Sequence, residues 1–260
     1  MNNSTITLEK LQQSPSFKCG YSPKYERNIR VFACNMIESA AVLLKLPQVA
    51  AATAQVLLHR FYFMVSISEF PLFDVIGACL YLSSKLEECP RRLRELLSVL
   101  DYLRKKAEKL PLTKLDITKA LYFDYREGLL KAEIEILAQL AFNVHVELPH
   151  GFMLNYLSSL ELSDHPELPQ IALNYLHDSL RTISCVLYQP PAIATAVIFL
   201  AARDCKVALP ENPPWYGVFD ADYEDIELIC TLILELYELK DGIVGFPETI
   251  KPDLAKPLVT

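Results

Sequence analysis

Residues 49–64, VAAATAQVLLHRFYFM, are the feature that most limits what this chain can fold into. Wound as a helix, the segment is apolar around much of its circumference, so little of its surface suits water. Such a helix is stable only when other helices enclose it. The segment therefore predicts a domain built around a central buried helix.

Helical periodicity continues on both sides of this segment. The first half is expected to hold five helices and the second half at least four, over residues 30–46, 49–64, 72–86, from just after Pro90, 117–142, 150–160, 168–187, 191–203 and 223–239. The chain has only 7 Gly, and most of its 17 Pro fall between these runs, which makes a sheet protein improbable. The fold class predicted is all-α.

The two ends of the chain lack this periodicity. Residues 1–28 are predicted to form a flexible arm, and residues 240–260, with three prolines, a tail. The arm contains Ser14-Pro15 and Ser22-Pro23, which are either plain turn chemistry or sites of proline-directed phosphorylation.

A short internal repeat links the two halves. Residues 78–85 read ACLYLSSK, and residues 196–203, 118 positions later, read AVIFLAAR. Both follow a proline, carry small residues that let neighbouring helices approach closely, and end in a cation. The repeat favours a duplicated all-helical module.

Charge and cysteine content exclude several classes of protein. A net charge of −7 and a pI near 5.3 argue against nucleic acid as the main partner. The seven cysteines are odd in number and widely spaced, which argues against a disulfide framework or a zinc ribbon. The N-terminus has no secretory pattern, and the longest apolar run, 191–202, is shorter than the roughly 20 residues that span a bilayer. A soluble intracellular protein is expected.

Motifs for catalysis, cofactors and metals are missing. The sequence has no GxxxxGK[ST], GxGxxG, HExxH or GxSxG. His145 and His150 have Pro149 between them and no third ligand nearby. His59, on the enclosed helix, fits a structural hydrogen-bonding role better than a catalytic base. No cofactor, metal or catalytic residue is predicted, and an all-helical enzyme is the remotest alternative.

Charged residues at one helix end are harder to explain. Lys85 ends an apolar run, where a cation suits the helix C-terminus, but Glu87 and Glu88 beside it do not. Glu133 lies among apolar residues in LLKAEIEIL. From these residues alone, a solvated surface remains the simpler interpretation of both Lys85 and Glu133.

Longer stretches resemble the cyclins, and within that family they look most like cyclin L of the transcription and splicing group. The match covers about residues 29–239 in the family's order and spacing, and the KLEE–PRRLR junction is typical of cyclins. The stretches are LPQVAAATAQVLLHRFYF (46–63), ACLYLSSKLEECPRRLRELLSVL (78–100), LLKAEIEILAQLAFNVHVELPH (129–150), NYLHDSLRT (174–182), YQPPAIATAVIFLAAR (188–203) and PPWYGVF (213–219).

The resemblance implies two tandem five-helix cyclin boxes, over residues 29–145 and 146–239. It implies a nuclear, non-enzymatic subunit that binds and activates a cyclin-dependent kinase of the PITSLRE type or another transcriptional kinase. Position by position, it implies that Lys85 and Glu133 hydrogen-bond the kinase backbone beside its mobile regulatory helix. The apolar part of that contact is implied for Leu86, Leu137, Phe142 and Val144.

Two questions stay open after the resemblance. A factor like the general transcription factor TFIIB also uses cyclin boxes, but it would need a basic face and a zinc ribbon. Arg91, Arg92 and Arg94 are left open as contacts to a kinase, to RNA or only to solvent. Cyclin L proteins usually continue into an Arg/Ser-rich tail, which this sequence does not include, so the link to splicing is weaker than the link to a kinase.

Overall fold

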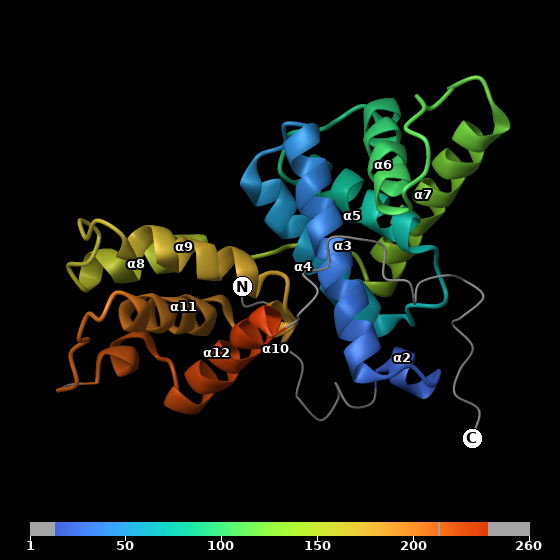
Figure 1. The fold of residues 1–260 in the computed structure, drawn as a ribbon. Helices are drawn as coiled ribbons and strands as arrows, with labels where there is room; N and C mark the ends of the chain where they lie inside the picture. The colour runs from blue at the N-terminus through green and yellow to red at the C-terminus, as the bar shows by residue number, and fades with distance from the viewer. Residues whose placement is uncertain (1–13, 213, 239–260) are drawn as a thin grey trace. The chain divides into compact units, whose positions relative to one another are not determined.

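The computed structural model describes residues 14–212 and 214–238, and this part of the chain is helical with no strand (Figure 1). Contacts divide the described residues into two compact units, 14–144 and 145–238. The first unit contains α2 (Pro15–Lys18), α3 (Pro23–Leu43), α4 (Gln48–Met64), α5 (Leu72–Leu86), α6 (Leu93–Ala107) and α7 (Ala120–Gln139). The second contains α8 (His150–Ser159), α9 (Leu168–Ser179), α10 (Ser184–Leu187), α11 (Pro190–Asp204), the 3-10 helix η1 (Trp215–Phe219) and α12 (Tyr223–Tyr237).

The core of the first unit lies around α4 and α5. Every residue of α4 from 50 to 62 is buried, as its apolar circumference predicts. Helix α5 packs against α3, α4, α6 and α7. None of the helices in the described ranges combines the length and the apolar content needed to cross a bilayer.

Two glycines let α5 and α7 approach each other closely. A Cβ on Gly77 of α5 would lie 2.7 Å from methyl carbons of Leu100 and Leu129. A Cβ on Gly128 of α7 would lie 2.6 Å from the Asp74 carboxylate. Both distances are shorter than a Cβ contact allows. The close spacing of these two helices therefore depends on glycine at both positions.

The expectation of a flexible arm was wrong for residues 15–18 and 23–28, which are helical. Ser14 and Ser22 cap α2 and α3, which is the turn chemistry of the two Ser-Pro pairs. The buried Ser14 hydroxyl also donates to Glu26 (3.0 Å), and Arg30 donates to Glu26 and to the carbonyl of His59. Residues 1–13 of the expected arm and the expected tail, 240–260, lie outside the described residues.

In the second unit, α11 packs against α8, α9 and α12, which lie around it in Figure 1. The single helix expected over 168–187 is instead two, α9 and α10. At the break, the carbonyl of Ser179 accepts hydrogen bonds from the hydroxyl groups of Thr182 and Ser184. Such local side-chain bonds compete with the helical ladder and end it.

Within the described residues, six α-helices end on a non-glycine residue in the left-handed region, with φ between 47° and 58°. In each case the amide of the next residue donates to the carbonyl five residues earlier, at 2.8–2.9 Å, which closes a Schellman motif. Glycine is the usual residue at this position, so the low Gly count leaves a small strain at each end. The six residues are Lys45, Glu88, Lys109, Ala141, Glu161 and Lys206.

Candidate functional site

The structure brings Lys85 and Glu133 together, although they are 48 residues apart in the sequence. The Lys85 Nζ donates to Glu133 Oε1 at 2.6 Å. Lys85 lies in the last turn of α5, and Glu133 lies on α7, in a stretch with buried Ala132 and Ile136. The close packing of α5 on α7 therefore places the two side chains within reach.

Burial of this ion pair is uneven. The Glu133 side chain is 9% exposed, whereas the Lys85 side chain is 41% exposed and lies over the Tyr81 ring, with Nζ 3.8 Å from the ring centroid. An ammonium group has three donors, and one of them is used on Glu133. The other two remain accessible at the edge of an otherwise apolar surface.

The apolar side chains that follow Lys85 and Glu133 in the sequence are partly exposed. Leu86 is 38% exposed and Phe142 is 73% exposed, while Leu137 and Val144 are half-buried. Phe142 follows the left-handed Ala141 at the end of α7 and is itself left-handed, with φ of 60°. Sequence reasoning missed Ile134, which is 67% exposed beside Glu133. The signal that could have found it is its position between Glu133 and Glu135.

Hydrogen bonds at the junction after α5 explain the positions of Glu87 and Arg91. Glu87 accepts a hydrogen bond from the Thr53 hydroxyl of α4 at 2.7 Å, which fixes one of the two carboxylates. Arg91 donates to the carbonyls of Leu44 and Lys45 at 3.0 and 2.7 Å. It therefore caps the C-terminus of α3. The neighbouring Arg92 and Arg94 are exposed.

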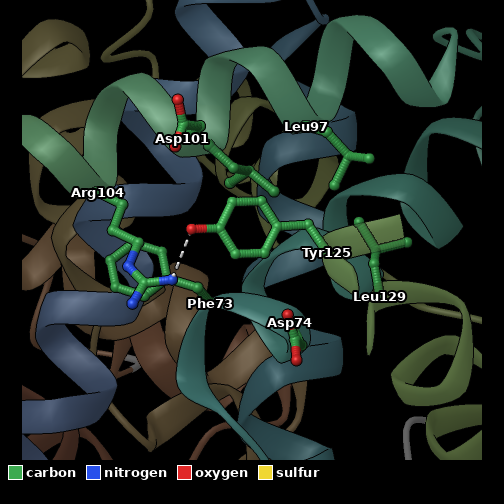
Figure 2. Close-up of a pocket in the computed structure, with 8 residues that line it drawn as sticks. Phe73, Asp74, Leu97, Asp101, Arg104, Tyr125 and Leu129 are labelled. Atoms are coloured by element: carbon green, nitrogen blue, oxygen red, sulfur yellow. Dashed lines mark hydrogen bonds between the residues drawn. The ribbon is translucent and has the colours of Figure 1, made fainter. Parts of the chain in front are cut away.

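A small cavity of about 30 Å³ lies between α5, α6 and α7, near the opposite end of α5. Figure 2 shows Arg104 donating to the Tyr125 hydroxyl at 3.1 Å, with the Phe73 ring close to the guanidinium. Asp74 also lines the cavity, and burial raises its pKa to about 6 although Arg104 opposes the shift. These residues hold the helices that carry Lys85 and Glu133.

His59, His150 and His177 take part in packing. His59 is fully buried, with Nε2 3.3 Å from Cys34 Sγ. The His150 ring lies 5.6 Å from that of His177, and burial lowers the pKa of His150 to about 4. Among the described residues, no group of three or more His, Cys, Asp and Glu side chains could hold a metal ion.

Taken together, the site offers a specific chemistry for recognition. One accessible ammonium and one nearly buried carboxylate can satisfy carbonyl and amide groups of a partner's main chain. Exposed Leu86, Ile134 and Phe142 can be covered by the same partner. The arrangement suits protein binding, because a charge pair at an apolar edge gives orientation and the apolar side chains give area.

The chain is similar to known proteins in sequence. The family model described as "Cyclin, N-terminal domain" matches residues 2–145, which is more than half of the chain. The chain is 42% identical to Cyclin-L1-1 of Oryza sativa subsp. japonica over 234 residues, covering 90% of this chain and 54% of that protein. It is 40% identical to Cyclin-L2 of Mus musculus over 243 residues, covering 92% and 46%. The chain thus spans about half the length of the curated relatives it matches.

Solved structures share the fold at low sequence identity. The crystal structure of the yeast RNA Pol II CTD kinase CTDK-1 complex matches with a TM-score of 0.76 and 16% identity, over 92% of this chain and 74% of that one. The CAK complex of Chaetomium thermophilum bound to ATP-gamma-S matches with a TM-score of 0.61 and 15% identity, over 95% and 88%. The two helical units therefore have the fold of two tandem cyclin boxes, and the chain belongs to the cyclin family.

Proposed function

We propose that this chain is a regulatory subunit that binds and activates a cyclin-dependent kinase. The observation that carries the proposal is the Lys85–Glu133 pair, formed at 2.6 Å between α5 and α7 with its carboxylate buried. Leu86, Leu137, Phe142 and Val144 supply the apolar part of the same contact, and the proposal includes exposed Ile134 with them.

The proposed mechanism is a population shift in the kinase. A kinase transfers phosphate only when its helix-borne glutamate reaches the strand lysine and its activation loop is ordered. A rigid surface that binds only the active arrangement favours that arrangement by its difference in affinity for the two states. The chain itself transfers no phosphate in this mechanism, and it needs no metal or cofactor.

The kinase proposed as partner belongs to the transcriptional class, such as the PITSLRE type. Relatives named cyclin L support this choice, and so does a structural neighbour that is a complex of a kinase for the RNA polymerase II C-terminal domain. A role in transcription and RNA splicing, and a nuclear location, follow from that partner. A gel-shift assay at physiological salt separates this function from that of a DNA-binding factor.

The test is removal of the charge pair from the full chain. Lys85→Ala with Glu133→Ala should abolish co-purification with the kinase and stimulation of its turnover, because truncating such a pair costs about 2–5 kcal/mol of binding. The matched control is Glu127→Ala with Lys131→Ala, which removes an ion pair of 2.7 Å on the same helix whose side chains are 67% and 69% exposed.

The folded state of both double variants is checked by circular dichroism before binding is measured. The control pair should leave kinase binding unchanged, since surface ion pairs contribute little. A folded Lys85/Glu133 double variant that still binds and activates the kinase like the wild type contradicts the assignment of these residues. A wild-type chain that stimulates no transcriptional kinase contradicts the proposed function itself.

A further inference from the structure

The two units carry opposite formal charges. Residues 14–144 contain 18 Lys and Arg against 14 Asp and Glu, which gives +4, whereas residues 145–238 contain 3 against 14, which gives −11. The modest net charge of the whole chain hides this difference. A field of one sign over a whole unit attracts oppositely charged partners and raises their association rate.

An aromatic groove opens on the acidic second unit, with a volume of about 620 Å³, between α11, η1 and the start of α12. Its aromatic side chains are Phe199, Trp215, Tyr216 and Tyr223. The rings form a continuous chain, because centroid distances are 6.3 Å from Phe199 to Tyr223, 5.7 Å from Tyr223 to Tyr216 and 6.3 Å from Tyr216 to Trp215. Trp215 is buried, and Tyr223 is 43% exposed, so the groove has an apolar floor and an accessible aromatic wall.

One ring of the groove already accepts a guanidinium. The Arg203 Cζ lies 5.4 Å from the centroid of Phe199. Attraction between a guanidinium and an aromatic face is strongest where water is partly excluded. Tyr216 and Tyr223 extend the same wall, and the charge of Arg203 also reaches Tyr223.

Two carboxylates, Glu211 and Glu227, lie in or beside the groove. Glu211 lines it directly, and the Tyr223 hydroxyl interacts with Glu227. These two carboxylates can pair with a cation that a ligand brings to the Tyr223 ring.

We propose that this groove binds an extended peptide segment that carries arginine. Its guanidinium stacks on Tyr216 and Tyr223, and Glu211 and Glu227 balance the charge. Arginine is favoured over lysine because a planar guanidinium stacks on aromatic rings and pairs with carboxylates at the same time. None of the kinase-binding residues proposed above lines this groove, so the two sites are separate surfaces.

Trp215 is the only tryptophan of the chain, which makes its fluorescence a direct report on the groove. The full chain is titrated with a synthetic decapeptide of alternating arginine and glycine, and with matched peptides that carry lysine, glutamate or proline in place of arginine. We expect a saturable, salt-sensitive change with the arginine peptide, weaker binding of the lysine peptide, and no binding of the other two.

Variants decide whether the groove itself is responsible. Tyr223→Leu should weaken arginine-peptide binding roughly five- to tenfold, and Glu211→Gln should weaken it about threefold. Arg203→Gln should tighten it about threefold, because it removes a competing cation from the groove. Tyr102→Leu is the control, since Tyr102 is similarly exposed, at 41%, but lies on the first unit.

Several outcomes overturn the proposal. Equal binding by wild type, Tyr223→Leu and Glu211→Gln means attraction by overall charge without the groove. Weaker binding by Arg203→Gln, or preference for the glutamate peptide, means an anionic ligand. Equal binding of the proline peptide means recognition of proline-rich segments. A flat titration by both fluorescence and calorimetry means that no such segment binds.

Discussion

Helices α5 and α11, one from each unit, end in the same way. In α5 an aromatic ring at Tyr81 lies under the cation of Lys85 four residues later, at 3.8 Å. In α11 Phe199 lies near the cation of Arg203, at 5.4 Å, again four residues later. The matching positions are 118 residues apart, which is the spacing of the short repeat in the sequence. The repeat is therefore a repeat of structure and not a chance likeness of two apolar helices.

The agreement extends past the end of each helix. Glu88 and Lys206, also 118 apart, are both left-handed, with φ of 52° and 56°. The next amides, of Cys89 and Val207, donate to the carbonyl five residues earlier at 2.9 and 2.8 Å. Because the main chain is the same at both ends, their different roles must come from the neighbouring helices.

A single neighbour makes the difference. In the first unit, α7 presents Glu133, so the cation of Lys85 is held in a partly buried pair. In the second unit, the cation of Arg203 lies beside the Phe199 ring at the rim of a groove, and its charge also reaches Tyr223. A duplicated scaffold has thus acquired two surfaces, one proposed to bind a kinase and the other an arginine-bearing segment.

The largest effect is expected where α5 differs most from α11 in packing. Gly77 corresponds to Thr195, and Gly77→Thr places a side chain where two leucine methyls already lie 2.7 Å from the Cβ position. Overpacking of this kind should lower the free energy of unfolding by about 3 kcal/mol in urea denaturation. The control is Gly151→Thr, at a helical glycine of the second unit with no atom within 4 Å of its Cβ position. A similar loss for both variants would contradict the packing explanation.

The second-largest effect is a difference in stability between variants of Lys85 and Arg203. Lys85→Met leaves the buried Glu133 without its partner and should cost about 1–2 kcal/mol, less than a fully buried pair because the ammonium is half exposed. Arg203→Met removes an exposed cation and should change stability by less than about 0.5 kcal/mol. Adding Glu133→Gln to Lys85→Met should recover most of the loss in urea denaturation at pH 7. An equal loss of stability in Lys85→Met and Arg203→Met would show that burial of Glu133 does not affect stability.

Local patterns predicted the fold well because helices are local structures. Apolar spacing predicted the long helices of the first unit, and Pro47 and Pro71 mark the starts of α4 and α5. The start of α3, at Pro23, was placed too late. The error over residues 15–18 and 23–28 arose because long-range bonds hold this part of the chain, such as the Ser16 hydroxyl accepting from the amide of Ile67. The pairing of Lys85 with Glu133 depends on the packing of two helices, which no local pattern encodes. Resemblance to the cyclins pointed to both residues, but nothing in the sequence pointed to the aromatic groove.

A smaller effect is expected at the shared left-handed position. Glu88→Gly should stabilise the chain by about 1 kcal/mol, since glycine relieves the backbone strain and removes a carboxylate from a helix C-terminus. Lys206→Gly should stabilise it by only about 0.5 kcal/mol, because the lysine it removes suits that terminus. Thermal unfolding of both variants measures the difference. A larger gain for Lys206→Gly would show that local charge does not distinguish the two helix ends.

The smallest effect concerns pH, and again only α5 should show it, because Asp74 corresponds to Ala192 of α11. Burial raises the pKa of Asp74 from 3.8 to about 6 in the folded chain, so its protonated form favours folding. This contribution is complete below pH 4 and is lost as the pH rises through 6. Asp74→Asn cannot ionise, so its melting temperature should exceed that of wild type by roughly 1–3 °C above pH 7, where partial exposure limits the gain. This difference in melting temperature should disappear below pH 4. A difference that does not change with pH would mean that the charge of the carboxylate has no effect and that only its shape and hydrogen bonds matter.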